Sequence, residues 1–259
     1  MDRQAIGKSL KLKVMLAVAA GAFSILPFAQ AAPQGGTSTT AEITATSATQ
    51  TDINSATANN VINWTSFSID KNEIVQFDGG NQTNNYLNIV TGSTASEIYG
   101  TLRGGNNVYL VNPNGILFGA SAQVNVGNLI ASTRSLSDAD KAAFLGGNNP
   151  ILANVATSAA GDITNLGSLQ AKQIVLEGNS VRIASTAKLT SDGTSLLQPV
   201  TIRAAGDVRI GYETTSVPVT EVNADEYTSG NIDTTTAATT LGYSVTALDG
   251  TTAKTGYDF

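Results

Sequence analysis

The sequence contains no cysteine and no histidine among its 259 residues. The missing cysteines exclude disulfide bonds and thiolate metal sites. The missing histidines remove the commonest general base and metal ligand, so a Ser-His-Asp triad cannot be assembled from this chain. Carboxylate chemistry stays open, because the chain still carries 20 Asp and Glu residues.

Charge of either sign is also scarce. Charged residues make up 13% of the sequence, and the net charge is −6. Residues 1–31 hold four Lys or Arg and one Asp, which gives this segment +3, so the remaining chain carries −9. The sequence has no basic stripe, and we therefore expect no nucleic-acid partner.

Hydrophobic residues are plentiful at 41%, which is enough to build a sizeable core. Glycine (25 residues), Thr, Ser, Ala and Asn are abundant, whereas the Leu, Glu and Lys that dominate helical proteins are not. This mixture favours many short strands with polar corners. Because composition does not change abruptly along the chain, we expect one elongated domain, or one domain with a tail.

The first 31 residues have the three parts of a secretory signal peptide. A basic stretch ends at Lys13, residues 14–28 are apolar, and the small residues Ala29 and Ala31 precede Ala32. The apolar run is too short for a confident membrane span. We therefore expect export and cleavage before Ala32, with an uncleaved anchor as the alternative.

Short strand-like segments follow one another closely from residue 61 to 133, bounded by Gly or Asn. Strands this short must stack or pair to bury a core. From 161 to 212 the pattern is more regular: Val-Arg-Ile occurs at 181–183 and again at 208–210, each time after a glycine-containing corner. No helical pattern separates these strands. The loose internal repeat of Val-Arg-Ile therefore predicts successive rungs of a parallel β-helix.

One helix interrupts the strands. Ser137 and Asp140 form a capping-box pattern, residues 141–145 continue a helical turn, and Gly146 ends it. A helix of about two turns is marginal alone and needs tertiary packing. We expect Phe144 or Leu145 to pack down, so that the helix covers a flank of the strand stack.

The central motif is Asn112-Pro113-Asn114-Gly115-Ile116, which lies between two apolar runs at 108–111 and 116–118. Asn, Pro, Asn and Gly suit the four successive positions of a type I turn. Both runs are apolar on both of their faces, which predicts strands with little solvent exposure.

These five residues resemble the NPNGI motif of the secretion domain of two-partner-secretion exoproteins, the filamentous haemagglutinin family. The resemblance covers residues 43–145 in the expected order, through segments 61–69, 72–77, 88–92, 96–100 and 128–133. A lone Asn-Pro-Asn-Gly turn would be a weak signal, but the ordered set is specific. The NPNL motif of some members is missing, because residues 81–87 read Asn-Gln-Thr-Asn-Asn-Tyr-Leu.

The resemblance implies an all-β protein: a right-handed parallel β-helix with an N-terminal cap, extra-helical β-hairpins and one short helix. It implies a secreted or cell-surface adhesin from a Gram-negative bacterium, whose N-terminal domain directs export through an outer-membrane transporter and nucleates β-helix folding. The expected partners are the transporter's periplasmic domains and a host-cell receptor or glycan. The chain is expected to be a monomer without catalytic activity, cofactor or metal.

The expected domain organisation combines this resemblance with the patterns above. The segments are a signal peptide (1–31), a Thr/Ser/Ala-rich segment leading into the cap (32–60), the secretion-domain core with the motif (61–160), regular rungs (161–212) and a weakly structured, Thr/Ala-rich end (213–259). Within the motif, Asn112 and Asn114 either stabilise a corner or are recognised in the unfolded chain by the transporter through strand addition. The two roles are compatible.

Two alternatives come from other classes of protein. A secreted β-helical carbohydrate-active enzyme would need an acidic groove, and the candidate carboxylates are Asp162, Glu177, Asp192, Asp207 and Glu213. Asp162 and Asp207 each follow a corner glycine, which makes them turn formers first. A structural fibre element of the cell surface is the third reading.

Two further features are expected to be structural. Trp64, Phe67 and Phe77 could form a carbohydrate platform, but we expect them to plug the end of the strand stack. Asparagines are frequent at strand ends, and in a solenoid such side chains can align and bond along the stack.

Overall fold

The computed structural model describes residues 32–78, 83–153, 159–191, 200–206, 208–212, 243–247 and 253–254. The chain divides into two units, Met1–Gln30 and Ala31–Phe259, and every described residue lies in the second. The predicted signal peptide, with Ala29 and Ala31, lies outside the described residues, as does most of the predicted weakly structured end.

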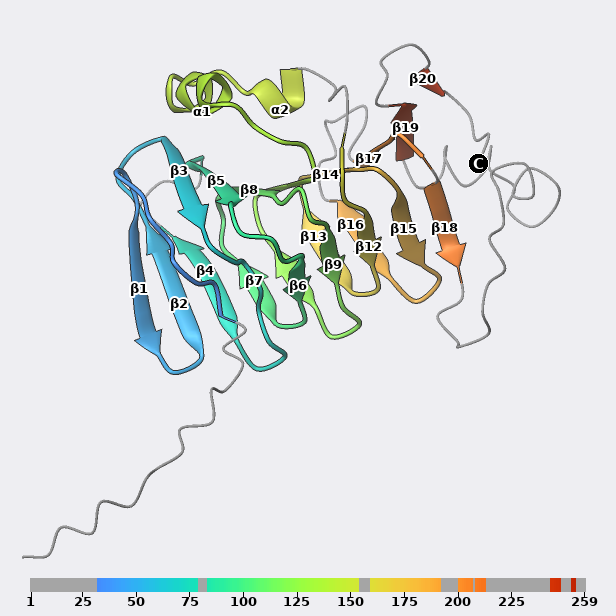
Figure 1. The fold of residues 1–259 in the computed structure, drawn as a ribbon. Helices are drawn as coiled ribbons and strands as arrows, with labels where there is room; N and C mark the ends of the chain where they lie inside the picture. Colours follow the sequence, from blue (N-terminus) through green and yellow to red (C-terminus); the bar gives the residue numbers. More distant parts are fainter. Residues whose placement is uncertain are drawn as a thin grey trace, which may run out of the picture. The chain divides into compact units, whose positions relative to one another are not determined.

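The described strand stack is built from three sheets, of which the third begins only at β6 (Figure 1). Sheet I contains β1 (Glu42–Ser47), β2 (Gln50–Asn54), β4 (Ile74–Asp78), β7 (Thr101–Arg103), β10 (Gln123–Asn125), β13 (Ser168–Ala171) and β16 (Lys188–Ser191). Sheet II contains β3 (Asn59–Trp64), β5 (Asn85–Val90), β8 (Asn107–Val111), β11 (Asn128–Ser132), β14 (Gln173–Gly178), β17 (Val200–Ala204), β19 (Tyr243–Ala247) and β20 (Ala253–Lys254). Sheet III contains β6 (Ser96–Ile98), β9 (Ile116–Phe118), β12 (Ile163–Asn165), β15 (Val181–Ala184) and β18 (Val208–Tyr212).

From β4 to β18 the chain visits the sheets in the order I, II, III and then begins again, so that β7, β8 and β9 form one rung and β10, β11 and β12 the next. Neighbouring rungs pair in parallel in all three sheets. This is the parallel β-helix that the sequence predicts. The same sheets continue through residue 161, because β9 pairs with β12 and β11 pairs with β14.

Alternating burial explains why these short segments become strands. In β10 only the middle residue, Val124, is buried, and it stacks in register on Leu102 and Leu169 of the adjacent rungs. Side chains with a period of two along each strand therefore fill the interior of the β-helix, while their neighbours face outward. Each rung covers the apolar residues of the one before it.

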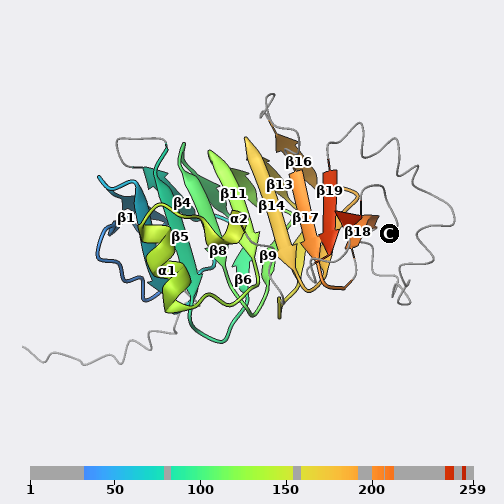
Figure 2. The same cartoon turned by 90° about the horizontal axis from the view of Figure 1, so that it is seen from above.

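Sheet II is apolar on both faces because a second core covers its outer side. Helix α1 (Asp138–Leu145) and helix α2 (Pro150–Ala153) are inserted between β11 and β12 and lie against this sheet (Figures 1 and 2). Phe144 and Ile151 pack on outward-facing residues that include Tyr109 and Ile130. The predictions of low exposure at 108–111 and of a packed helix are both confirmed.

The capping box predicted for α1 is present. The Ser137 hydroxyl accepts a hydrogen bond from the Asp140 backbone N–H, and the Asp140 carboxylate accepts one from the Ser137 backbone N–H. The second helix, α2, was not predicted. Neither of these described helices is long and apolar enough to cross a membrane.

The N-terminal end of the stack is covered by chain running in the opposite direction. β1 pairs antiparallel with β2, and Thr37 exchanges backbone hydrogen bonds of 2.9 Å with Asn63 on β3. Beneath this cover, the Trp64 indole N–H donates to the Asn88 side-chain oxygen at 3.0 Å, and its ring meets Phe67 edge-on.

Trp64, Phe67 and Phe77 are each about fully buried, at 1% exposure. They pack near the N-terminal end of the stack, as expected. A carbohydrate platform would need exposed ring faces, which these residues do not offer.

Candidate functional site: the Asn-Pro-Asn-Gly corner

The motif forms the corner at which the chain passes from β8 in sheet II to β9 in sheet III. The Gly115 N–H donates to the Asn112 carbonyl oxygen at 3.1 Å, which is the hydrogen bond of the predicted four-residue turn. Gly115 has a φ of +112°, a conformation that favours glycine over residues with a Cβ. The glycine therefore allows the sharp change of direction.

Asn112 is fully buried, and its side chain is hydrogen-bonded at both ends. Its amide nitrogen donates to the Thr94 carbonyl oxygen and to the Ser96 hydroxyl, both at 3.0 Å. Its side-chain oxygen accepts a hydrogen bond from the Asn114 backbone N–H at 2.9 Å. A buried amide is costly unless it is paired in this way, so Asn112 fixes the corner to the preceding rung.

Asn114 is exposed, but it reaches the same neighbouring corner. Its amide nitrogen donates to the Gly92 carbonyl oxygen at 2.8 Å and to the Asn112 side-chain oxygen at 3.0 Å. The two asparagines therefore join the corner after β8 to the corner after β5. This geometry supports the corner-stabilising role, and recognition by a transporter stays a prediction.

The next rung packs closely against the other side of the corner. The Ile116 N–H donates to the Asp162 carbonyl oxygen at 3.0 Å. A Cβ built on Gly161 would lie 2.3 Å from the Gly115 nitrogen, so only glycine fits there. The motif therefore touches the rungs before and after its own.

A shallow depression of about 500 Å³ lies beside the corner, bordered by Asn114, Leu117, Asp162 and Asn179. Asp162 is occupied within the fold: its carboxylate binds Arg182 at 2.7 Å and accepts the Ser180 backbone N–H at 3.0 Å. Burial acts to raise the pKa of Asp162, but the hydrogen bonds from Arg182 and Asn179 outweigh it and lower the pKa. The Asp162 carboxylate therefore joins its corner to the corner of the next rung at Asn179 and Ser180, and it does not close its own turn as the sequence suggests.

An asparagine ladder runs along the outer start of the sheet II strands. Asn85 donates to Asn59 at 2.7 Å, Asn107 donates to Asn85 at 2.9 Å, and Asn128 donates to Asn107 at 2.9 Å, in each case from side chain to side chain. The predicted bonding of aligned asparagines along the stack is confirmed.

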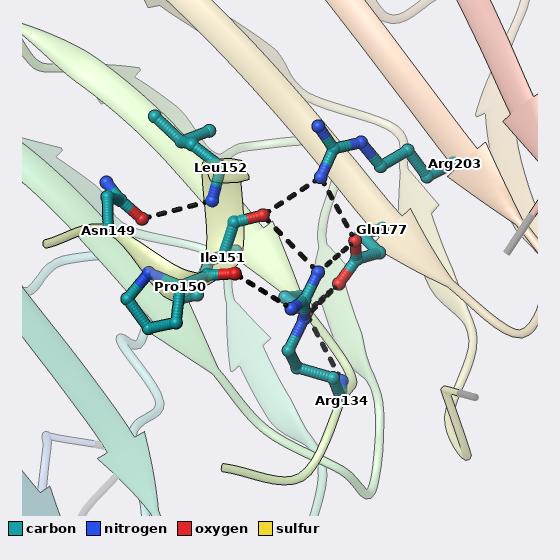
Figure 3. A network of polar contacts seen from close by, with 8 residues as sticks. Arg134, Asn149, Pro150, Ile151, Leu152, Glu177 and Arg203 are labelled. Carbon is teal, nitrogen blue, oxygen red and sulfur yellow. Dashed lines mark hydrogen bonds and ion pairs between the residues drawn. The ribbon is translucent and has the colours of Figure 1, made fainter. Parts of the chain in front are cut away.

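Glu177, a candidate carboxylate in the sequence, is buried in an ion-pair network rather than exposed in a groove (Figure 3). Arg134 contacts both of its oxygens, at 2.6 and 2.5 Å, and Arg203 lies 3.3 Å away. Arg203 also donates to the Ile151 carbonyl oxygen at 2.9 Å, and Arg134 to the same oxygen at 3.3 Å. The network attaches α2 to the outer face of sheet II.

Burial acts to raise the pKa of Glu177, but hydrogen bonds from Arg134 and Ser132 and the positive charges of both arginines outweigh it. The pKa therefore lies below its ordinary value of 4.5. A carboxylate held in this way is ionised and structural. Sequence reasoning did not identify Arg134 or Arg203, and nothing local marks them as partners of Glu177.

The other candidate carboxylates, Asp192, Asp207 and Glu213, lie outside the described residues. Within the described ranges, no group of three or more Asp, Glu, His or Cys residues could hold a metal ion. Asp162 and Glu177 are each bound to arginine; Asp162 lies in the corner just before β12 of sheet III, whereas Glu177 lies on β14 of sheet II. The described residues thus give no support to an acidic catalytic groove.

Comparison with known proteins decides the family. The family model "TPS secretion domain" matches residues 29–255, which spans nearly the whole chain. The chain belongs to the TPS secretion domain family. The corner described above therefore sits inside a secretion domain, in agreement with the resemblance of its sequence motif.

Two curated relatives of this secretion domain are heme/hemopexin-binding proteins from Haemophilus influenzae. One is 32% identical over 144 residues, which is 54% of this chain and 16% of the relative. The other is 40% identical over 75 residues, which is 29% of this chain and 8% of the relative. The chain therefore spans less than a fifth of either relative.

The fold is also similar to the crystal structure of the HMW1 secretion domain from Haemophilus influenzae. The match has a TM-score of 0.51 and 24% sequence identity, and it covers 69% of this chain and 45% of that chain. The likeness supports the predicted fold class, a β-helix.

Proposed function

We propose that this secretion domain directs the export of an exoprotein through a partner transporter in the outer membrane. The observation that carries the proposal is the family match over residues 29–255, which includes every described strand. Residues 1–31 would act as a signal peptide that brings the chain to the periplasm, where the transporter would engage the domain before it folds.

The β-helix supplies a physical reason for movement in one direction. Each rung that folds outside the cell adds an interface with the rung before it, so its folding opposes return of the chain through the pore. In this proposal the Asn112 and Asn114 bonds favour early stacking, because they join two consecutive corners of the stack.

The exported protein would be an adhesin that contacts a host-cell receptor or glycan. This part of the proposal rests on the family alone, because the chain spans less than a fifth of its curated relatives. Catalysis is not part of the proposed function.

The test is secretion of the chain in a bacterium with two membranes, with and without the partner transporter co-expressed from the source genome. We expect the protein in the medium only when the transporter is present. A transporter with its periplasmic domains deleted is the matched control and should leave the chain in the periplasm. Release without the transporter, or retention in its presence, would contradict the proposal.

A further inference from the structure

We propose that Asn114, which precedes Gly115, deamidates spontaneously while the chain is unfolded. The folded corner protects it from this reaction. Asn114 and Gly115 form the only Asn-Gly pair in the sequence. The proposal does not depend on the transporter, because it concerns the chemistry of the chain itself.

The reaction is succinimide formation followed by hydrolysis. The Gly115 backbone nitrogen attacks Cγ of Asn114, the Cγ–Nδ2 bond breaks, and ammonia leaves with the proton that the Gly115 nitrogen gives up. Water then opens the ring to aspartate or isoaspartate, so one amide has been exchanged for one carboxylate. Glycine has no Cβ to obstruct the attack, which makes this pair more reactive than other Asn-containing pairs.

Asn112 is a built-in comparison within the same turn. It carries the same side chain, but it is followed by Pro113, whose backbone nitrogen has no hydrogen to lose. Asn112 therefore cannot follow this route. The motif places one inert and one reactive asparagine two residues apart.

The folded corner holds both nitrogens of the reaction, the attacking Gly115 N–H and the departing Asn114 amide, in hydrogen bonds. The Gly115 N–H donates to the Asn112 carbonyl oxygen, and the Asn114 amide donates to Gly92 and to the Asn112 side chain. Ring formation needs the Asn114 side chain to rotate and all three bonds to break. Gly115 is also buried, and its carbonyl oxygen accepts the Ser96 N–H at 3.0 Å, so the backbone cannot easily adjust.

Modification before folding would damage the corner. An aspartate at position 114 has no donors, and its carboxylate would face the Gly92 carbonyl oxygen and the Asn112 side-chain oxygen, which are both acceptors. Isoaspartate would add a carbon to the backbone just before β9, whose Ile116 pairs with Ser96 and with Ile163. The modification therefore limits how long the unfolded chain stays able to fold correctly.

The first experiment compares the purified chain in its folded state and in concentrated urea, at the same mildly alkaline pH. Trypsin releases residues 104–134 as one peptide, and fragmentation mass spectrometry locates deamidation among its asparagines. We expect Asn114 to react fastest in urea and at least about tenfold more slowly in the folded chain, because three hydrogen bonds must break first. Equal rates in both states, or no preference for Asn114 in urea, would overturn the proposal.

A pair of variants tests the consequence for the corner. Asn114→Asp should lower the urea midpoint of unfolding, whereas Asn125→Asp makes the same charge change on the exposed outer face of sheet I and should leave the midpoint unchanged. Equal midpoints for both variants would show that modification does not harm the corner. This result would overturn the inference that modification limits how long the unfolded chain stays able to fold correctly. If Asn114→Asp fails to fold, the urea comparison on the unaltered chain still decides where modification occurs.

Discussion

At the scale of single residues, buried amides hold the corners of this secretion domain in place. One buried carboxylate holds the helical insertion, α1 and α2, against sheet II. Asn112 and Glu177 are both fully buried, and both owe their place to partners on other rungs. Polar groups held in this way stabilise little when compared with well-packed apolar side chains, but they cost much when one partner is removed.

Replacing the buried corner amide should destabilise the domain. Asn112→Ala leaves the Thr94 carbonyl oxygen, the Ser96 hydroxyl and the Asn114 N–H without this partner, so we expect a loss of about 1–3 kcal/mol in the free energy of unfolding. Urea denaturation measures it, and the transporter-dependent secretion yield should fall as well. Asn125→Ala, at an exposed strand position, is the control. A variant as stable and as well secreted as the parent would contradict both expectations.

Replacing Glu177 should give a larger effect that depends on pH. Glu177→Gln leaves the buried Arg134 and the part-buried Arg203 without their counter-charge, so we expect a loss of about 3–5 kcal/mol near neutral pH. Because the folded pKa lies below the ordinary value of 4.5, the contribution of Glu177 is fully present above that value and is lost as the pH falls through the folded pKa. Stability curves of parent and variant should therefore converge in acid.

Glu97→Gln provides the matched control for that experiment, since the Glu97 side chain is exposed on β6. We expect its stability to follow the parent at every pH. Parallel curves for the Glu177→Gln variant and the parent, with no convergence in acid, would show that the ionised carboxylate is not what holds the network.

The sequence predicts residue-scale features only where the partners are close in the chain or repeat along it. The Asn112–Gly115 turn and the Asn59–Asn85–Asn107–Asn128 ladder follow from local turn chemistry and from repetition. The Glu177 network joins side chains 43 and 26 residues apart, and no pattern in the sequence brings them together. Only the fold places them in contact.

At the scale of elements, helices α1 and α2 cover the outer face of sheet II and form a second hydrophobic core with it. The sequence predicts α1 because its capping box is local, and it predicts that 108–111 is buried on both faces. It also predicts that this helix covers a flank of the strand stack, but it does not show that the covered face is the outer side of sheet II. The Asn149–Pro150 pair was a usable signal for α2, because Asn149 accepts the Leu152 N–H at 3.0 Å and proline suits the first helical position.

The packing of α1 is testable through two adjacent residues. Phe144 is buried edge-on against Tyr109, whereas Leu145 is 43% exposed. Phe144→Ala should cost about 3–5 kcal/mol and should increase amide hydrogen exchange across α1, whereas Leu145→Ala should change both much less. Equal effects of the two substitutions would show that α1 is not held by its contact with sheet II.

At the scale of the whole domain, contacts join each rung mainly to its neighbours. Stability should therefore be lost locally, as in other solenoids. The single tryptophan, Trp64, lies at the N-terminal end of the stack, whereas Ile202 is buried on β17, several rungs away. These two positions allow the two ends of the stack to be followed separately.

Ile202→Ala should lower the urea midpoint measured by far-UV circular dichroism by an amount that corresponds to about 2–5 kcal/mol. The midpoint measured by Trp64 fluorescence should change much less, because four strands of sheet II lie between the two sites. Ile62→Ala, on the same strand as Trp64, is the matched comparison and should shift the fluorescence midpoint strongly. If Ile202→Ala shifted both midpoints equally, the domain would unfold as one cooperative unit.

The antiparallel chain at the start of the stack also gives the molecule polarity. A rung that continues the parallel β-helix must pair in parallel with the exposed strand edges. At the N-terminal end, β1 and the segment around Thr37 run antiparallel to the strands that they cover. A second copy therefore cannot extend the β-helix continuously from that end.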